Sequence, residues 1–190
     1  MPRTDDLHKV PEGLPQPGND GACDHLLRMT MPPIFLPSTS GKSVSLADAS
    51  CENRVIVYCY PRTGTPNTTL PPGWNDIPGA RGCTPESCAF RDHWQELQAL
   101  QADVFGLSTQ TTEYQQEMVE RLHLPFAILS DADLALTQSL RLPTFAEAGM
   151  VLIKRLTLVL TQSKVEHVFY PIFPPDKHAE EVIAWLKKVN

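Results

Sequence analysis

"RVIVYCY", residues 54–60, is an almost unbroken apolar run that leads into a long segment rich in proline and glycine. Such a run is typical of a central strand that is buried on both faces. Residues 61–82 contain five prolines and four glycines, so we expect a long loop there. After the loop, Thr84 is predicted to cap a helix, with Pro85 in its first position. The segment therefore predicts a buried strand joined to a helix by a long loop.

Strands and helices continue to alternate after this helix. Strands are predicted over 103–108 and 126–130, and helices over 112–123 and 133–140. A hairpin of 153–161 and 164–171 and a closing helix over 176–189 complete the pattern. This order predicts an α/β sandwich with a mixed central sheet flanked by helices.

The length of 190 residues suits one compact domain. Residues 1–24 are rich in Pro, Gly and Asp, so we expect a flexible N-terminal arm followed by one domain over 25–190. The net charge of −6 argues against nucleic acid or an anionic membrane as a partner. The chain has no apolar stretch of membrane-spanning length. We expect a soluble, cytoplasmic protein.

The chain has five cysteines, an odd number that makes a poor disulfide framework. In a reducing compartment, a close cysteine pair is more often catalytic, redox-active or metal-binding. Cys59 lies on the predicted buried strand, and Cys23 and Cys51 are also interpreted as small packed side chains. Cys83 and Cys88 are therefore the candidates for chemistry.

Cys83 lies in the first turn of the predicted helix, near unpaired backbone N–H groups and the positive end of the helix dipole. Both features favour the thiolate, so we expect a lowered pKa and a nucleophilic sulfur. Two other interpretations stay open at this point. Cys83 and Cys88 are structural side chains in one, and they bind zinc with His93 in the other.

A bond between Cys83 and Cys88 conflicts with an intact helix. Helical geometry places Cα atoms five residues apart on the order of 8–9 Å from each other, with diverging side chains. Disulfides need Cα atoms within about 7 Å. An 83–88 bond is therefore predicted to require unwinding of the first helical turns.

Four stretches resemble the peroxiredoxins, most closely the peroxiredoxin Q type, which is also called bacterioferritin comigratory protein. They are "VIVYCYPRTGTP" (55–66), "GCTPESCAFRDHWQEL" (82–97), "FGLSTQTTEYQQEMVERLHLPFAILSD" (105–131) and "KRLTLVLTQSKVEHVFYP" (154–171). The Cys-x4-Cys pattern at a helix start, followed by an arginine on a later strand, makes the resemblance specific. It covers about residues 30–189.

The resemblance implies a thioredoxin-like fold and a thiol peroxidase that reduces H2O2 or organic hydroperoxides without a cofactor. Cys83 matches the peroxidatic cysteine, which becomes a sulfenic acid. Cys88 matches the resolving cysteine, which forms an intramolecular disulfide. Arg155 matches the arginine that holds the peroxide and lowers the thiolate pKa. Thioredoxin or a similar dithiol is the implied reductant, and the protein is expected to be a monomer or weak dimer.

The sequence departs from the family at one position. The family motif has a threonine three residues before the peroxidatic cysteine, whereas this chain has Ala80. Thr65 keeps the first half of the motif, but an insertion over 66–81 separates it from Cys83. Either the insertion bulges out and Thr65 still reaches the site, or a hydroxyl comes from elsewhere. The insertion is a candidate lid or donor-docking surface, or a plain surface loop.

Two other functions remain as alternatives. One is a thioredoxin-like disulfide oxidoreductase, although the Cys-x2-Cys motif is absent. The other is a non-catalytic redoxin that senses redox state or binds a partner, in which the insertion has replaced the peroxidase geometry. Peroxide consumption by the purified protein separates the peroxidase from both.

Overall fold

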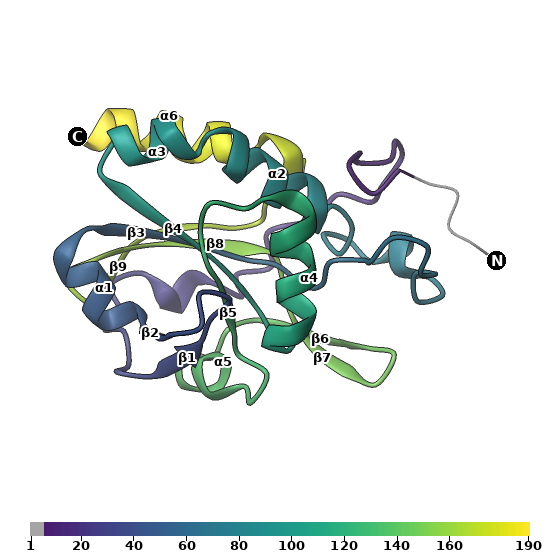
Figure 1. Cartoon of the computed structure of the whole chain (residues 1–190), viewed down its shortest axis with the longest axis horizontal. Coiled ribbons are helices and arrows are strands. Elements are labelled where there is room, and N and C mark those ends of the chain that lie inside the picture. Colours follow the sequence, from purple (N-terminus) through teal and green to yellow (C-terminus); the bar gives the residue numbers. More distant parts are fainter. Residues whose placement is uncertain (1–5) are drawn as a thin grey trace.

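The computed structural model describes residues 6–190, and its centre is a five-stranded mixed sheet (Figure 1). The strand order is β5-β4-β3-β8-β9. β3 pairs in parallel with β4 and antiparallel with β8, so the sheet is mixed, as predicted. The strands are β3 (Arg54–Cys59), β4 (Ala102–Ser108), β5 (Ile128–Ser130), β8 (Leu156–Thr161) and β9 (Lys164–Phe169).

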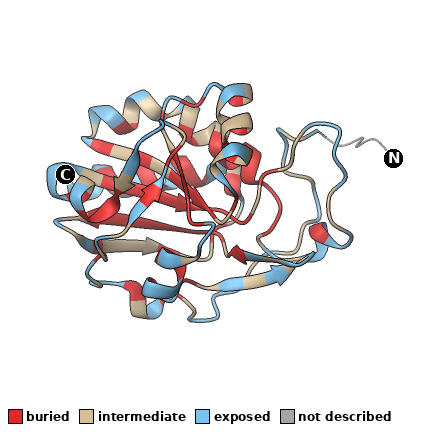
Figure 2. Cartoon of the chain, turned by 60° about the horizontal axis from the view of Figure 1, so that its bottom comes forward, coloured by how far each residue is buried: buried red, intermediate tan, exposed pale blue. Residues whose placement is uncertain are grey.

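β3 shows why the apolar run predicts a central strand. Its alternate residues Val55, Val57 and Cys59 belong to the core on one face of the sheet. Ile56 and Tyr58 belong to the core on the other face. Side chains along a strand point alternately to opposite faces, so a strand covered on both sides must be apolar throughout. Figure 2 shows the buried residues concentrated in these strands.

Helices cover both faces of the sheet (Figure 1). The core on one face includes side chains of four helices, namely α2 (Cys83–Asp92), α3 (Trp94–Ala99), α4 (Thr112–Leu122) and α6 (His178–Val189). The core on the other face includes side chains of α1 (Leu46–Glu52) and α5 (Ala135–Leu140). Two short hairpins complete the fold, β1 (Phe35–Pro37) with β2 (Ser43–Ser45) and β6 (Thr144–Glu147) with β7 (Met150–Ile153). The predicted α/β sandwich with a mixed central sheet flanked by helices is confirmed.

The start of α2 differs from the prediction. The helix begins at Cys83, with Gly82 as its N-cap, so Thr84 is not the cap and Pro85 is the third helical residue. Gly82 has a φ of 106°, a left-handed conformation that glycine adopts without a steric penalty. The left-handed Gly82 turns the chain sharply before the helix, so Cys83 is the first helical residue.

Two predicted elements are divided in the structure. The apolar face from Phe90 to Leu100 predicted one helix, but a break at His93 separates α2 from α3. The predicted strand 153–161 is likewise divided, because β7 ends at Ile153 and β8 begins at Leu156. Arg155 lies in the bend between β7 and β8.

The N-terminal segment 6–24, expected to be a flexible arm, has little regular structure but lies against the domain. Asp20 accepts hydrogen bonds from Lys154 at 3.0 Å and from the hydroxyl of Tyr170 at 2.8 Å. Cys23 is buried in the core beside the sheet. The part of the predicted arm over residues 1–5 lies outside the described residues.

Within residues 6–190, no helix is both long enough and apolar enough to span a membrane. The remaining short elements are the 3-10 turns Asp24–Leu26, Trp74–Asp76 and Pro175–Lys177.

Candidate active site

Two chain segments meet at the carboxyl end of β3. The long loop leaves β3 there and returns as α2, which begins at Cys83. β8 runs antiparallel to β3, and its first residue, Leu156, pairs with Cys59 at the end of β3. Arg155 directly precedes β8 and therefore lies at the same sheet edge. Sheet topology thus brings Cys83 and Arg155 together across a wide sequence separation.

Cys83, Glu86 and Arg155 form a buried group. The Nη2 of Arg155 donates to Cys83 Sγ at 3.1 Å, and its Nη1 donates to Glu86 Oε2. All three residues are at most 3% exposed. Cys83 and Glu86 are three residues apart on α2, so both side chains lie on one helix face. One cation is therefore shared between a carboxylate and a sulfur atom.

Backbone carbonyls of the loop hold the rest of the guanidinium. Arg155 Nε donates to the carbonyl of Gly79 at 3.2 Å, and Nη2 also approaches the carbonyls of Ala80 and Arg81 at 3.4 and 3.3 Å. A guanidinium has five N–H donors in a planar fork. These contacts orient the fork so that one nitrogen faces Cys83 Sγ.

The pKa of Cys83 differs from the prediction made from the helix start. Burial raises the pKa of the Cys83 thiol above its ordinary value, and the charge of Arg155 opposes that rise. The negative charge of Glu86 raises it further, while the backbone N–H of Arg62 lowers it by donating to the sulfur. Desolvation outweighs the favourable groups because the side chain is enclosed. The electrostatic partners of a thiolate are nevertheless in place around the sulfur.

Gly82 lies in close contact with Pro175. A Cβ atom at Gly82 would be 2.4 Å from Cγ of Pro175, which real Cβ contacts do not reach. Pro175 begins the short turn Pro175–Lys177, which directly precedes α6 and packs against α2. Glycine is therefore required here by both its φ angle and its lack of a side chain.

Cys88 lies on the same helix as Cys83. It is partly buried against the core, and its Sγ is 3.8 Å from Nδ1 of His8. All five cysteines are free thiols in the described residues. Because α2 is continuous from Cys83 through Cys88, the geometric expectation of about 8–9 Å between their Cα atoms applies to this state. A bond between them requires the first turns of α2 to open.

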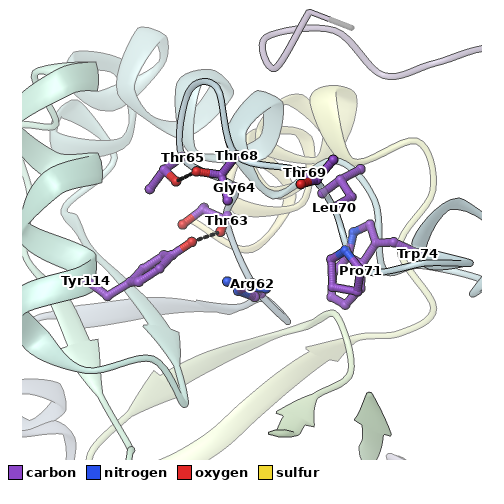
Figure 3. A pocket seen from close by; sticks show the side chains of 10 residues that line it. All are labelled: Arg62, Thr63, Gly64, Thr65, Thr68, Thr69, Leu70, Pro71, Trp74 and Tyr114. Atoms are coloured by element: carbon purple, nitrogen blue, oxygen red, sulfur yellow. Dashed lines mark hydrogen bonds between the residues drawn. The ribbon is translucent and has the colours of Figure 1, made fainter. Parts of the chain in front are cut away.

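The structure does not bring Thr65 to Cys83. Thr65 Oγ1 forms a hydrogen bond of 2.7 Å with Thr68 Oγ1, within the inserted loop (Figure 3). It lines a surface pocket with Tyr114, whose hydroxyl donates to the carbonyl of Thr63 at 2.8 Å. Cys83 lines a different small pocket, in which the hydroxyl-bearing residue is Thr84.

The insertion packs as a small core of its own. Trp74 is 3% exposed and Ala80 is 1% exposed, and both pack with Leu152 of the β6–β7 hairpin. The ring of Trp74 lies 6.2 Å from that of Phe145 on the same hairpin. An apolar side chain at position 80 suits this cluster, whereas a buried hydroxyl there would need a partner. The insertion thereby fixes the carbonyls that hold Arg155.

Several parts of the site were missed by the sequence analysis. Glu86 was interpreted only as a favourable charge at the helix start, although its i, i+3 spacing from Cys83 was a usable signal. His8 and Leu7 were missed because nothing local predicts that the N-terminal segment returns to α2. The other three cysteines were interpreted as packed side chains. Cys23 and Cys59 are buried as predicted, but Cys51 is exposed. Among residues 6–190, no three or more His, Cys, Asp or Glu side chains lie together as a group that could hold a metal ion.

The fold agrees with the comparisons to known proteins. A family model described as Redoxin matches residues 27–183, which is most of the chain. The chain belongs to the redoxin family. Peroxiredoxin Bcp of Escherichia coli is 31% identical over 161 residues, which cover 83% of this chain and 92% of that protein. This redoxin is therefore a peroxiredoxin of the Bcp type, as its sequence motifs indicated.

Two further similarities fit the same family. Peroxiredoxin bcp1 of Schizosaccharomyces pombe is 29% identical over 128 residues, and the match spans 58% of its length. The crystal structure of peroxidoxin BcpB from Mycobacterium tuberculosis superposes with a TM-score of 0.68 at 26% identity, covering 86% of this redoxin and 97% of that chain. These similarities favour a thiol peroxidase over a disulfide oxidoreductase or a non-catalytic redoxin.

Proposed function

We propose that this redoxin is a thiol peroxidase in which Cys83 attacks the substrate hydroperoxide. The observation that carries the proposal is the 3.1 Å contact between Cys83 Sγ and Arg155 Nη2 at the first residue of α2. A sulfur at a helix N-terminus and beside a guanidinium can carry a negative charge when peroxide enters. Membership of the peroxiredoxin family supports the same chemistry.

In the first step, the Cys83 thiolate attacks the terminal oxygen of the hydroperoxide. The new S–O bond forms as the O–O bond breaks, and the alkoxide or hydroxide that leaves takes up a proton. Cys83 becomes a sulfenic acid, and the peroxide is reduced to an alcohol or water. Arg155 is suited to stabilise both the thiolate and the negative charge that develops on oxygen.

In the second step, Cys88 attacks the sulfenic acid of Cys83, and a disulfide and water are formed. The first turns of α2 must open for this step, because the intact helix keeps the two residues apart. A dithiol protein such as thioredoxin then reduces the disulfide by thiol exchange. We further propose that the enzyme works as a monomer or weak dimer in the cytoplasm, which gel filtration and cell fractionation test. Thr65 is not part of this mechanism.

The test is peroxide consumption by the reduced, purified protein with H2O2 or cumene hydroperoxide. Cys83→Ser is expected to abolish consumption, whereas Cys88→Ser retains one turnover without an added thiol. Mass spectrometry after one equivalent of peroxide should identify a Cys83–Cys88 bond in the wild type. Full activity of Cys83→Ser would refute the proposal, and a bond from Cys83 to Cys51 or Cys59 would remove Cys88 from it.

A further inference from the structure

The N-terminal segment reaches both cysteines of α2. Leu7 lines the small pocket around Cys83. His8, the next residue, has its Nδ1 3.8 Å from Cys88 Sγ, within the range of a hydrogen bond to sulfur. Consecutive Cα atoms are only about 3.8 Å apart. One imidazole therefore lies against Cys88 and close to the pocket of Cys83.

Further contacts hold the segment across the site. Leu14 and Pro15 line a pocket together with Arg155. Pro17 packs near Gly79, whose carbonyl accepts from Arg155. At the end of this segment, Asp20 accepts hydrogen bonds from Lys154 and Tyr170. The position of His8 thus follows from a series of contacts along the segment.

Cys88 needs a base to act as a nucleophile. The thiolate is the attacking form in disulfide formation, and burial raises the pKa of the Cys88 thiol. The positive charges of Arg91 and Arg121 oppose that rise, and Asp92 adds to it. Asp92 accepts a hydrogen bond from Arg91 Nε at 2.8 Å, and Tyr58 is a buried phenol whose hydroxyl donates to Ser87 at 3.1 Å.

Among residues 6–190, His8 provides the side-chain nitrogen that contacts Cys88 Sγ. An imidazole is a good proton acceptor near neutral pH, and a cysteine beside a histidine is a recurrent way to activate a thiol. We propose that His8 is the base that removes the proton from Cys88 when Cys88 attacks the oxidised Cys83. This role rests on the proposed peroxidase function.

The proton balance of the step is complete. The proton of the Cys88 thiol moves to Nδ1 of His8, and the Cys88 thiolate attacks the sulfur of Cys83. The S–S bond forms as the S–O bond of the sulfenic acid breaks. The imidazolium of His8 returns the proton to the departing hydroxide, which leaves as water. Cys88 is oxidised and Cys83 is reduced from the sulfenic to the disulfide state.

The experiment separates oxidation from resolution. The reduced full-length protein is mixed with one equivalent of H2O2, quenched with acid at set times, alkylated and analysed by mass spectrometry. Loss of the Cys83 thiol gives the oxidation rate, and appearance of the Cys83–Cys88 disulfide gives the resolution rate. The variants are His8→Gln, His8→Gly and the matched control Lys9→Gln, an exposed neighbour on the same segment.

His8→Gln should leave the oxidation rate within about twofold and slow resolution about tenfold or more, as loss of a general base does. Lys9→Gln should match the wild type in both rates. Added imidazole should restore resolution in His8→Gly in a saturable manner.

Two results would overturn the role of His8. One is a wild-type resolution rate in His8→Gln. The other is slow resolution in His8→Gly that imidazole does not restore, since this would mean that His8 only packs against the helix. Failure of the peroxidase function itself is distinguishable, because Cys83 of the wild type would then not be oxidised at all.

Discussion

Replacing Gly82 by alanine tests the physical basis of the site. Gly82 is the N-cap of α2, it has a φ of 106°, and a Cβ there would be 2.4 Å from Pro175 Cγ. An L-residue in a left-handed conformation costs about 1–2 kcal/mol. Forcing an extra carbon into a packed contact costs about 1–3 kcal/mol more. Gly82→Ala should therefore lower the free energy of unfolding by about 2–5 kcal/mol.

Gly41→Ala is the matched control for the backbone contribution. Gly41 has a φ of 80°, and a Cβ there would meet no atom within 4 Å. Its substitution should cost only the conformational part, about 1–2 kcal/mol. The difference between the two variants therefore measures the contact with Pro175.

The assay is urea unfolding of both reduced variants beside the wild type, followed by the rate of reaction with H2O2. Gly82→Ala should also slow that reaction, because Cys83 is the next residue and its sulfur must shift relative to Arg155. Gly41→Ala should react at the wild-type rate. Equal losses of stability in the two variants would refute the argument, because the contact with Pro175 would then carry no energy.

Three further predictions test other parts of the structure. Arg155→Lys keeps the positive charge but loses the planar guanidinium, so the pKa of Cys83 should rise. The second-order rate constant for the reaction with H2O2, measured by competition, should fall about tenfold or more. An unchanged rate constant would contradict this. Trp74→Ala removes the centre of the insertion core and should cost about 3 kcal/mol in denaturant unfolding; a loss below about 1 kcal/mol would mean that the loop is not held there. Hydrogen bonds from Lys154 and other groups lower the pKa of Asp20 to about 2 from its ordinary 3.8. The stabilisation that the ionised Asp20 carboxylate gives the folded state is therefore fully present above pH 3.8. It is lost as the pH falls through about 2. Lys154→Met should move the NMR titration midpoint of Asp20 back toward 3.8, and an unmoved midpoint would contradict the ion pair.

Local patterns predicted much of the fold. The apolar run 54–60 indicated a strand covered on both faces, and the period of the later segments indicated alternating helices and strands. These patterns succeed because strand and helix periodicity act over a few residues. The start of α2 was misplaced because a left-handed glycine replaced the side-chain cap that Thr84 suggested.

Patterns in the chain could not show how the inserted loop packs. The motif suggested that Thr65 could supply the hydroxyl beside Cys83, yet Thr65 forms a hydrogen bond with Thr68. Ala80 packs in the small core around Trp74. The packing of Ala80 depends on the β6–β7 hairpin, which is distant in sequence. Packing against a distant element leaves no periodic signal in the loop itself.

The sequence by itself determined the order of the elements, the buried strand and the placement of a cysteine at a helix start, because each depends on neighbouring residues. Only the tertiary structure decided that Arg155 is shared between Cys83 and Glu86 and that His8 contacts Cys88. These contacts join residues from opposite parts of the chain. They exist because the antiparallel pairing of β3 with β8 and the path of the N-terminal segment close the site around the start of α2.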